Sequence, residues 1–437
     1  MGERGVITVI GLDGSPLSPQ ARAAIEAATL LVGGRRQLAA VPAGNGASTV
    51  TLGEVGPALA ALAGHRGNAV VLASGDPGFF GIVRALHRHG LAATVLPAVS
   101  SVALAFARAG LSWDDAVVVS AHGRDLRQAV NVCRAHPKVA VLTGPGAGPA
   151  EIGTALTGWR RRMIVCEHLG TSQERITGCR PAASRRRSWA DPNVVLVLAG
   201  AATAGEGPAA TAPAATSLAE VDEGPGWIWP LSAAAAGWAL PEEEFDTRGA
   251  VITKSEVRAL ALARLAPAPG RLVWDVGAGT GSVGVECARF GAAVVAVERD
   301  GQRCARVRAN ARRHRVDVRV VHAEAPAALG RLPEPDSVFI GGGGAAVVEA
   351  VAARQPGRIV VARAAIERAG ETHTALVKAG YAVEGALVQA ARFAPLPGDA
   401  HRLAGTNPVF LLWAAPVTGF GPHGSPAEPA DSRGAPR

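Results

Sequence analysis

The chain has 437 residues, of which 48% are hydrophobic and 18% charged, so it is long enough for two or three domains and too apolar to be disordered throughout. Its formal charge of +8 is compatible with an acidic partner, whereas an aromatic content of only 4% argues against a surface that stacks nucleic-acid bases. The five cysteines include no CxxC pair, which indicates neither a zinc site nor a disulfide framework and fits a reducing cytoplasm.

The N-terminal residues run directly into a strand-like segment, with no basic stretch followed by a long apolar core. No stretch reaches the roughly 18 consecutive apolar residues that a membrane span needs. We therefore expect a cytoplasmic protein that is neither exported nor bound to a membrane.

The composition divides the chain into two globular units. We expect a first unit at residues 5–200 and a second at 227–415. Residues 201–226 contain almost no large apolar side chain and are predicted to be a flexible linker. Residues 416–437, rich in Pro, Gly and Ser, are predicted to be a disordered tail.

Both units alternate short runs of β-branched residues with stretches rich in Ala, Leu and Arg. This pattern is typical of α/β folds, in which helices cover parallel sheets. In the first unit we expect strands at 6–10, 69–73, 94–96, 116–120, 139–142 and 194–198. In the second unit we expect them at 272–276, 294–298, 318–322, 337–340, 358–362 and 409–413.

Several loops of the first unit follow predicted strands. Ser18 and Pro19 predict the N-cap and the first residue of a helix. In the segment ASGDPGFF, Asp76 either caps a helix that begins at Pro77 or helps to bind a ligand. The segment LPAVSS at 96–101 repeats the arrangement, and both loops should fall at the carboxyl edge of the sheet, where ligands bind.

The strongest motif is VWDVGAGTGS at 273–282, which combines a buried strand, three alternate glycines and a helix start. Glycines let backbone N–H groups approach a ligand, and Glu298 ends the next strand, where it can accept hydrogen bonds from both hydroxyls of a ribose. The GxGxG spacing differs from the GxGxxG of dinucleotide folds. Asp275 would repel a pyrophosphate but suits an ammonium group, directly or through water. Together these features favour S-adenosylmethionine over NAD, and over a turn that binds nothing.

Three further segments of the second unit bear on ligands. The third strand leads to Glu324, which either lies beside the adenine or starts a helix near Pro326. Four glycines at 341–344 leave space and bare N–H groups for a broad substrate that carries carboxylates. Thr253 and Glu256 predict a capping box, with Thr253 as N-cap and Glu256 at the third helical position.

Six segments cover nearly the whole second unit in order: LPEEEFDTRGAVITKSEVRAL, WDVGAGTGSVGVE, AVERD, AEAP, FIGGGG and TNPVF. They resemble the decarboxylating C15-methyltransferases of corrin biosynthesis, which implies a Rossmann-like class I S-adenosylmethionine methyltransferase. The resemblance implies that the cofactor is bound by Thr253, Gly277, Ala278, Gly279, Thr280, Gly281, Glu298 and Ala325. The chain departs from these relatives at 361–364, VARA, where they more often carry a run like Ala-Val-Thr.

The first unit carries ITVIG, LVGGRRQL, LASGDPGFFGI, LPAVSSVALAFARAGLSWDDAVVVSAHGR, LTGPGAGPAEI, CEHLGTSQERI and DPNVVLVL. These segments resemble the tetrapyrrole methylases, and most closely the C5-methyltransferases of precorrin. The resemblance implies two α/β subdomains with S-adenosylmethionine folded between them. The implied contacts are Ser74, Gly75, Asp76, Phe79, Ser100 and Ser101, together with Leu142 and Thr143.

Joined in this order, the units resemble the decarboxylating precorrin-6Y C5,15-methyltransferases. The resemblance implies two S-adenosylmethionine sites and methylation of precorrin-6B at C5 and C15. It also implies loss of CO2 from the C12 acetate, which gives precorrin-8X in cobalamin biosynthesis. We expect a homo-oligomer without nucleic-acid or membrane partners, no metal, and no residue that the sequence identifies as a catalytic base.

Some interpretations stay open at this point. The substrate is either metal-free or a cobalt-precorrin. An RNA methyltransferase would explain the positive charge, and a non-enzymatic sensor on a degenerate methylase fold would lack a glycine loop or Glu298. The arginine runs at 35–36, 160–162 and 185–187, and the turn at 122–124, either contact substrate carboxylates or are ordinary surface and turn residues.

Overall fold

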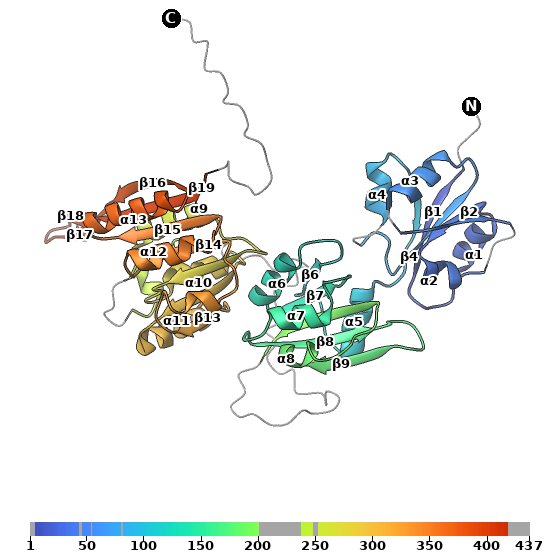
Figure 1. The fold of residues 1–437 in the computed structure, drawn as a ribbon, viewed down its shortest axis with the longest axis horizontal. Helices are drawn as coiled ribbons and strands as arrows, with labels where there is room; N and C mark the ends of the chain where they lie inside the picture. The colour runs from blue at the N-terminus through green and yellow to red at the C-terminus, as the bar shows by residue number, and fades with distance from the viewer. Residues whose placement is uncertain are drawn as a thin grey trace, which may run out of the picture. The chain divides into compact units, whose positions relative to one another are not determined.

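The structure is a computed structural model that describes residues 5–42, 46–53, 55–79, 82–200, 237–247 and 252–417. The chain divides into two compact units, residues 1–133 with 137–230 and residues 134–136 with 231–437 (Figure 1). The predicted linker lies outside the described residues, as does the predicted tail beyond residue 417. Among the helices described, none combines the length and the apolar character needed to cross a bilayer.

A parallel five-stranded sheet opens the first unit. Its strands are β1 (Ile7–Leu12), β2 (Leu30–Gly33), β3 (Ser48–Thr51), β4 (Ala69–Ser74) and β5 (Thr94–Leu96). They are hydrogen-bonded in the order β3-β2-β4-β1-β5. The helices are α1 (Pro19–Glu26), α2 (Arg35–Ala39), α3 (Val55–Gly64) and α4 (Ile82–Arg88). As predicted, Ser18 caps α1, because its hydroxyl accepts a hydrogen bond from the Ala21 N–H at 3.1 Å.

A second, mixed sheet completes the unit. Its strands are β6 (Val117–Ser120), β7 (Lys138–Leu142), β8 (Arg161–Glu167), β9 (Arg175–Cys179) and β10 (Asn193–Ala199), in the order β6-β7-β10-β8-β9. Only the β6–β7 pair is parallel, whereas the sequence pattern predicted parallel strands. The helices are α5 (Ser101–Ala109), α6 (Leu126–Ala135), α7 (Pro149–Ala155) and α8 (Pro181–Ser184).

Helix α5 connects the two sheets of the first unit. It follows β5 of the first sheet, but Val102, Ala105 and Phe106 pack against Leu196 of β10 in the second sheet. The loop at 97–100 is therefore the passage from one subdomain to the other.

The second unit has a seven-stranded sheet. Its strands are β11 (Leu272–Val276), β12 (Ala293–Glu298), β13 (Arg319–His322), β14 (Ser337–Ile340), β15 (Arg358–Arg363), β16 (Tyr381–Val388) and β19 (Val409–Pro416). Their order is β13-β12-β11-β14-β15-β19-β16; the first five are parallel, and β19 is antiparallel to both of its neighbours, β15 and β16. Strands β17 (Ala391–Pro395) and β18 (His401–Gly405) form a separate antiparallel hairpin.

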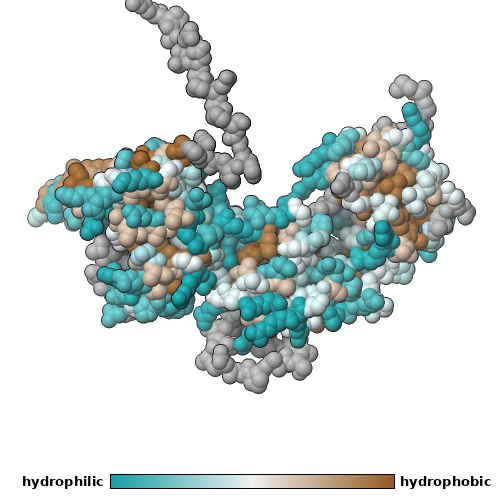
Figure 2. Space-filling model, in the orientation of Figure 1, coloured by the Kyte–Doolittle hydropathy of each residue, from teal (hydrophilic) through white to brown (hydrophobic). Residues whose placement is uncertain are grey.

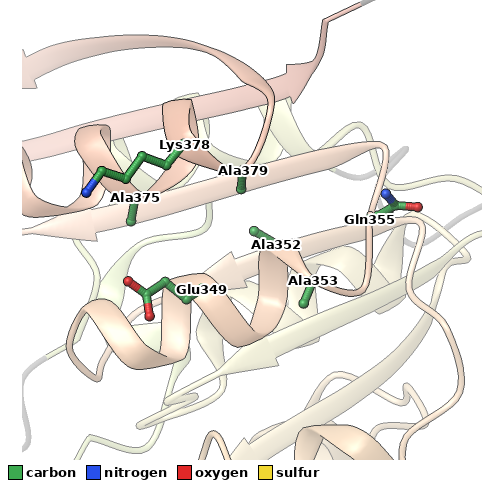
Figure 3. A pocket seen from close by; sticks show the side chains of 7 residues that line it. All are labelled: Glu349, Ala352, Ala353, Gln355, Ala375, Lys378 and Ala379. Carbon is green, nitrogen blue, oxygen red and sulfur yellow. The ribbon is translucent and has the colours of Figure 1, made fainter. Parts of the chain in front are cut away.

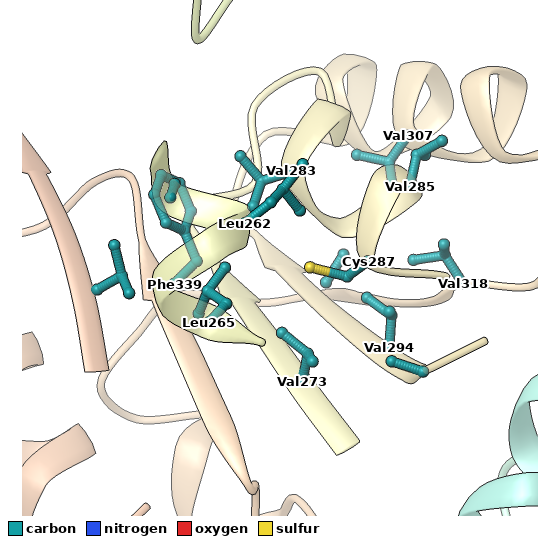
Figure 4. Packing of buried hydrophobic residues seen from close by; sticks show 14 of the residues in the cluster. Leu262, Leu265, Val273, Val283, Val285, Cys287, Val294, Val307, Val318 and Phe339 are labelled. Carbon is teal, nitrogen blue, oxygen red and sulfur yellow. The ribbon is translucent and has the colours of Figure 1, made fainter. Parts of the chain in front are cut away.

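Helices of the second unit alternate with its strands. They are α9 (Ser255–Leu265), α10 (Ser282–Arg289), α11 (Gly301–Arg313), α12 (Ala345–Ala352) and α13 (Ile366–Lys378), with 3-10 turns at Glu242–Glu244 and Leu329–Arg331. Leu262 and Leu265 of α9 and Val283 of α10 pack with Val273 and Phe339 of the sheet (Figure 4). Burial of each such side chain contributes about 1.5–3 kcal/mol. This core gives the carboxyl ends of the central strands a rigid base.

Every predicted strand is present, with its ends within three residues of the prediction. The prediction missed β2, β3, β8, β9 and β16–β18. Most of these lie at sheet edges or pair antiparallel, where burial is partial and the apolar runs are short.

Candidate cofactor sites

The loop between β11 and α10 is fastened to the end of β12. The N–H groups of Gly277 and Ala278 donate to one carbonyl of β12, at 2.9 and 3.2 Å. The carboxylate of Glu298, a residue that is 4% exposed, accepts from the N–H groups of Gly279 at 2.9 Å and Asp300 at 3.0 Å. The glycine loop and the acid that the sequence paired for a ribose ligand thus lie in direct contact.

The loop that follows β14 packs against the glycine loop. Gly277 has a φ of +71°, and a Cβ at this position would stand 2.8 Å from the backbone nitrogen of Gly342. The Gly341 N–H donates to the carbonyl of Val276 at 2.9 Å. By contrast, a Cβ on Gly279 would meet nothing within 4 Å, so this side of the loop is open to a ligand.

Asp275 lies beneath the loop and is only 1% exposed. Its Oδ2 accepts a hydrogen bond from the Gly284 N–H at 2.9 Å, whereas Oδ1 has no partner within the described residues. Burial raises the pKa of Asp275 to about 7, in spite of the hydrogen bond from Gly284. An unsatisfied buried carboxyl oxygen fits a ligand that brings a cationic group, as S-adenosylmethionine does with its ammonium.

The predicted capping box before α9 is wrong. The helix begins at Ser255 with Lys254 as N-cap, and no side chain caps it. Glu256 is therefore the second helical residue, and its carboxylate binds Arg392 of β17 at 2.7 Å. Arg392 also holds Glu242, whose pKa is lowered to about 2 by that hydrogen bond. The carboxylate of Glu256 is therefore bound by a guanidinium from a strand far along the chain, and it does not cap its own helix.

Thr253 is held by a buried ion pair instead. Arg258 and Glu286 are both completely buried, with Nε and Oε1 2.5 Å apart. Glu286, on α10, also accepts from the N–H groups of Ala239 and Leu240 at 2.6 and 3.0 Å. Arg258 donates through Nη1 to the carbonyl of Thr253 at 2.6 Å. Thr253 is thereby attached to the helix that follows the glycine loop.

Asn310 of α11 is a positioning residue that the sequence analysis missed. Its side chain is buried and donates to the carbonyl of Thr280 at 2.9 Å, while its Oδ1 accepts from the Asp246 N–H at 2.7 Å. It thus ties the segment before α9 to the glycine loop. The sequence feature that could have revealed it is a polar residue on the apolar face of α11, where Val307 and Ala311 are also buried.

The turn after β13 lies beside Glu298. The Ala323 N–H donates to the Glu298 carbonyl at 3.1 Å, which places Ala325 in the next turn of chain. Glu324 points to solvent, where its carboxylate is 3.3 Å from Arg299, and both side chains are mostly exposed. The predicted contact between Glu324 and an adenine remains a prediction.

A pocket of about 400 Å³ between α12 and α13 lies elsewhere (Figure 3). Residues at the C-terminal ends of the two helices line it, among them Gln355 and Ala379, which follow those ends. In a parallel α/β sheet, helices end at the amino edge of the strands, opposite the glycine loop. This pocket is therefore separate from the cofactor site.

In the first unit, the loops after β4 and β5 lie against each other. A Cβ on Gly75 would stand 3.1 Å from the nitrogen of Ser101 and 3.3 Å from the Cα of Ser100. The hydroxyl of Ser100 accepts from the Ala103 N–H at 3.1 Å and caps α5. The predicted residues Ser74, Gly75, Ser100 and Ser101 are thus brought together.

Two further residues support this edge and were not predicted. Asp13 accepts from the N–H groups of Val99 at 3.1 Å and Ser15 at 3.0 Å. Burial acts to raise the pKa of Asp13, but the hydrogen bond from the Ser15 hydroxyl and those from the Ser15 and Val99 N–H groups outweigh burial and lower it. Gln37 donates through Nε2 to the hydroxyl of Ser74 at 2.6 Å.

Of the two alternatives for Asp76, the one in which it caps a helix that begins at Pro77 is wrong. Asp76 accepts from the Gly78 N–H at 2.8 Å and, through its carbonyl, from the Phe79 N–H at 3.1 Å, which closes a turn. Helix α4 is described only from Ile82. Asp76 therefore shapes the turn, and its second carboxylate oxygen accepts no bond that the described residues provide.

Phe79 and Leu142 both pack against the cluster around Phe106 of α5. The hydroxyl of Thr143 donates to the carbonyl of Asn193 at 2.6 Å, so it joins the end of β7 to the start of β10. These contacts connect the first loop system to the second sheet, as a cofactor lying between two subdomains requires. Within the described residues no group of His, Cys, Asp and Glu could hold a metal ion.

Each of the two units matches a family of known proteins. Residues 10–182 match the tetrapyrrole (corrin/porphyrin) methylases, and residues 243–414 match the precorrin methyltransferase domain. A precorrin-6Y C(5,15)-methyltransferase (decarboxylating) from Sinorhizobium sp. is 37% identical over 375 residues, which cover 81% of this chain and 83% of that protein. The chain belongs to this family.

Other members of the precorrin-6Y methyltransferase family are similar. The protein of that name from Mycobacterium tuberculosis is 33% identical over 365 residues, 77% of this chain and 80% of its own length. A crystal structure of the Geobacter metallireducens precorrin-6y C5,15-methyltransferase is 33% identical, covers 41% of this chain and 97% of that chain, and has a TM-score of 0.38. Membership confirms the predicted α/β tetrapyrrole methylase and methyltransferase domains, and it implies S-adenosylmethionine as methyl donor and a precorrin substrate.

Proposed function

We propose that this chain methylates precorrin-6B at C5 with its first unit and at C15 with its second. Loss of CO2 from the C12 acetate accompanies the second methylation, and the product is precorrin-8X of cobalamin biosynthesis. The observation that carries the proposal is that each unit has loops packed together at the carboxyl ends of parallel strands, inside the region matched by its own family. Two S-adenosylmethionine molecules are therefore used, one in each unit.

In the second unit, each part of the cofactor has a residue suited to it. Glu298 accepts hydrogen bonds from the ribose hydroxyls, for which its carboxylate is already oriented by the Gly279 and Asp300 N–H groups. The open side of the loop at Gly279 receives the methionine part, and Asp275 lies under it to offset the ammonium charge. When bound, the cofactor supplies a methyl group already activated by its sulfonium.

In the first unit, the cofactor lies along the packed loops of Ser74–Gly75 and Ser100–Ser101. Asp76 presents a carboxylate oxygen to it, and Phe79 closes the side that faces the second sheet. Support for this placement comes from the contacts that join these loops and from the match over residues 10–182.

The protein's main task in either unit is alignment. A reduced tetrapyrrole offers electron-rich carbons, so the chain has to hold one such carbon in line with the methyl group and keep water away. Decarboxylation releases an electron pair that the conjugated macrocycle can accept. The four glycines at 341–344 pack against the glycine loop and carry no side chains that would project toward that macrocycle.

The direct test is incubation of the full chain with precorrin-6B and labelled S-adenosylmethionine, followed by mass spectrometry. We expect a product that has gained two methyl groups and lost one CO2. A parallel incubation with the cobalt-containing substrate identifies the preferred form. A product with one methyl group and an intact acetate would contradict the proposal for the second unit, and no reaction with either substrate would contradict it entirely.

We also propose that the chain forms a homo-oligomer in the cytoplasm. Phe393 of β17 and Leu403 of β18 face each other across the hairpin and are 81% and 65% exposed. Figure 2 shows apolar surface at this hairpin, at the left end of the view. Such a patch favours burial against a second copy. Sedimentation should show an oligomer that Phe393→Glu converts to a smaller species, and a monomeric parent chain would contradict this.

A further inference from the structure

Arg363 ends β15 with a buried guanidinium that forms no hydrogen bond or ion pair with a carboxylate of the described residues. The residue is 7% exposed. Its Nε donates to the hydroxyl of Thr372 at 3.1 Å and its Nη1 to the carbonyl of Ala362 at 3.4 Å. Nη2 is buried and has no hydrogen-bond partner among the described residues. Buried guanidinium groups are ordinarily paired, so this one calls for a counter-ion.

The surroundings of Arg363 add positive charge. Arg368 of α13 lies beside the loop that follows β14, because its Nη1 is 3.4 Å from the position that a Cβ on Gly344 would occupy. The charge of Glu371 acts to raise the pKa of Arg363, but Glu371 pairs with Arg368 at 3.4 Å, and both of these side chains are more than half exposed. Burial lowers the pKa of Arg363, and the charge of Arg368 lowers it further. Arginine nevertheless stays protonated in proteins.

The position of Arg363 relates it to the substrate. Strand β15 runs parallel to β14, so both end at the edge that carries the glycine loop and Glu298 (Figure 1). The chain that follows β14, residues 341–344, presents only backbone, and Ala364 and Ala365 after Arg363 are small and exposed. Ligands of open α/β sheets bind at this edge.

We propose that Arg363 is a specificity-determining residue that binds a carboxylate of the tetrapyrrole substrate, with Arg368 at the rim of the same site. The inference rests on the proposed function of the second unit. A carboxylate has two acceptor oxygens in the plane of the guanidinium, so it can satisfy Nη2 in a charge-assisted bond.

The carboxylate bound by Arg363 is one that the product retains. When a carboxylate leaves as CO2, its negative charge moves into the macrocycle. A guanidinium paired with that carboxylate would stabilise the starting state more than the transition state and slow the reaction. Arg363 therefore orients the substrate through a side chain other than the acetate that is lost.

The test compares Arg363→Gln and Arg363→Lys with a matched control, Arg354→Gln. Arg354 is also a partly buried arginine of the second unit, but it precedes β15 and pairs with Glu334 away from the proposed site. We expect Arg363→Gln to raise KM for the precorrin about tenfold to hundredfold with little change in kcat, as for loss of a charge-assisted bond. Arg363→Lys should fall between, because it keeps the charge but loses the planar fork.

Two further readouts separate the alternatives. Titration of the precorrin's visible absorbance, without methyl donor, should show the same loss of affinity in Arg363→Gln and none in Arg354→Gln. The affinity for S-adenosylmethionine and the ratio of one CO2 per C15 methyl should stay unchanged. A lower melting temperature with unchanged KM, in Gln or Lys variants, would overturn the proposal and leave the proposed function intact.

A changed ratio of CO2 to methyl would show that Arg363 binds the departing acetate and would overturn its assignment to a retained carboxylate. If Arg363→Gln does not fold, an unchanged KM in Arg363→Lys overturns the proposal by itself. Absence of C15 methylation in the unmodified chain would instead contradict the proposed function.

Discussion

Replacement of Glu298 by alanine should disable the second unit and spare the first. Alanine removes both acceptors of the Gly279 and Asp300 N–H groups. Each orphaned donor costs about 1–3 kcal/mol, so for the two donors we expect the free energy of unfolding of this unit to fall by about 2–6 kcal/mol. The variant also loses the hydrogen bonds to the ribose. At about 1.5–3 kcal/mol for each charged bond, binding of S-adenosylmethionine should weaken at least a hundredfold.

The assay measures methyl groups and CO2 separately. With labelled S-adenosylmethionine and precorrin-6B, Glu298→Ala should give a product with one added methyl group at C5 and an intact acetate. Glu349→Ala is the matched control, because Glu349 is an exposed acid of the same unit that lines the distant pocket of Figure 3. Normal C15 methylation by the Glu298 variant would refute the assignment of the acid. Loss of both methylations in a folded variant would refute the independence of the units.

Three other changes test how the second unit is built. Gly277→Ala should abolish C15 methylation and lower the melting temperature, because the new Cβ meets Gly342 and the +71° φ is unfavourable for alanine; unchanged activity would contradict this packing. Glu286→Gln should cost about 3–5 kcal/mol in urea unfolding, since the charge of Arg258 loses its buried partner, and a cost below about 1 kcal/mol would show that the pair is dispensable. The pKa of Asp275 is about 7 in the folded protein, whereas the ordinary value for an aspartate, expected in the unfolded chain, is 3.8. The folded state therefore binds more protons between these values. The free energy of unfolding should fall by up to about 4 kcal/mol as the pH rises from about 4 to 7. Asp275→Asn should remove this slope in pH-dependent unfolding, and a slope that persisted would place its cause elsewhere.

The sequence predicted the parts of the fold whose geometry is decided locally. The buried runs of β11 and β14 were placed to the residue, since their apolar content leaves no other role. Ser18 and Pro19 likewise defined the start of α1. In the same way, the GxGxG loop and the acid at the end of β12 could be paired from spacing alone.

What the sequence could not predict depends on partners far along the chain. Glu256 looked like part of a capping box, but Arg392, which lies 136 residues away, takes its carboxylate. Arg161 belonged to a run that suggested a surface or a substrate contact. The structure buries it in β8, where its Nε donates to the carbonyl of Cys133 at 2.6 Å. Charged residues interrupt the apolar runs of β8, an interior strand, and of β16, an edge strand, so both were missed.

The contacts that shape each candidate cofactor site come from within its own unit. In the second unit, Glu286 and Asn310 fasten the segment before α9 to α10 and to the glycine loop. In the first unit, Asp13 and Gln37 hold the loops after β5 and β4. Within the described residues, neither of these sets of contacts includes a residue of the other unit. This is the physical reason to expect that a single substitution at Glu298 separates the two methylations.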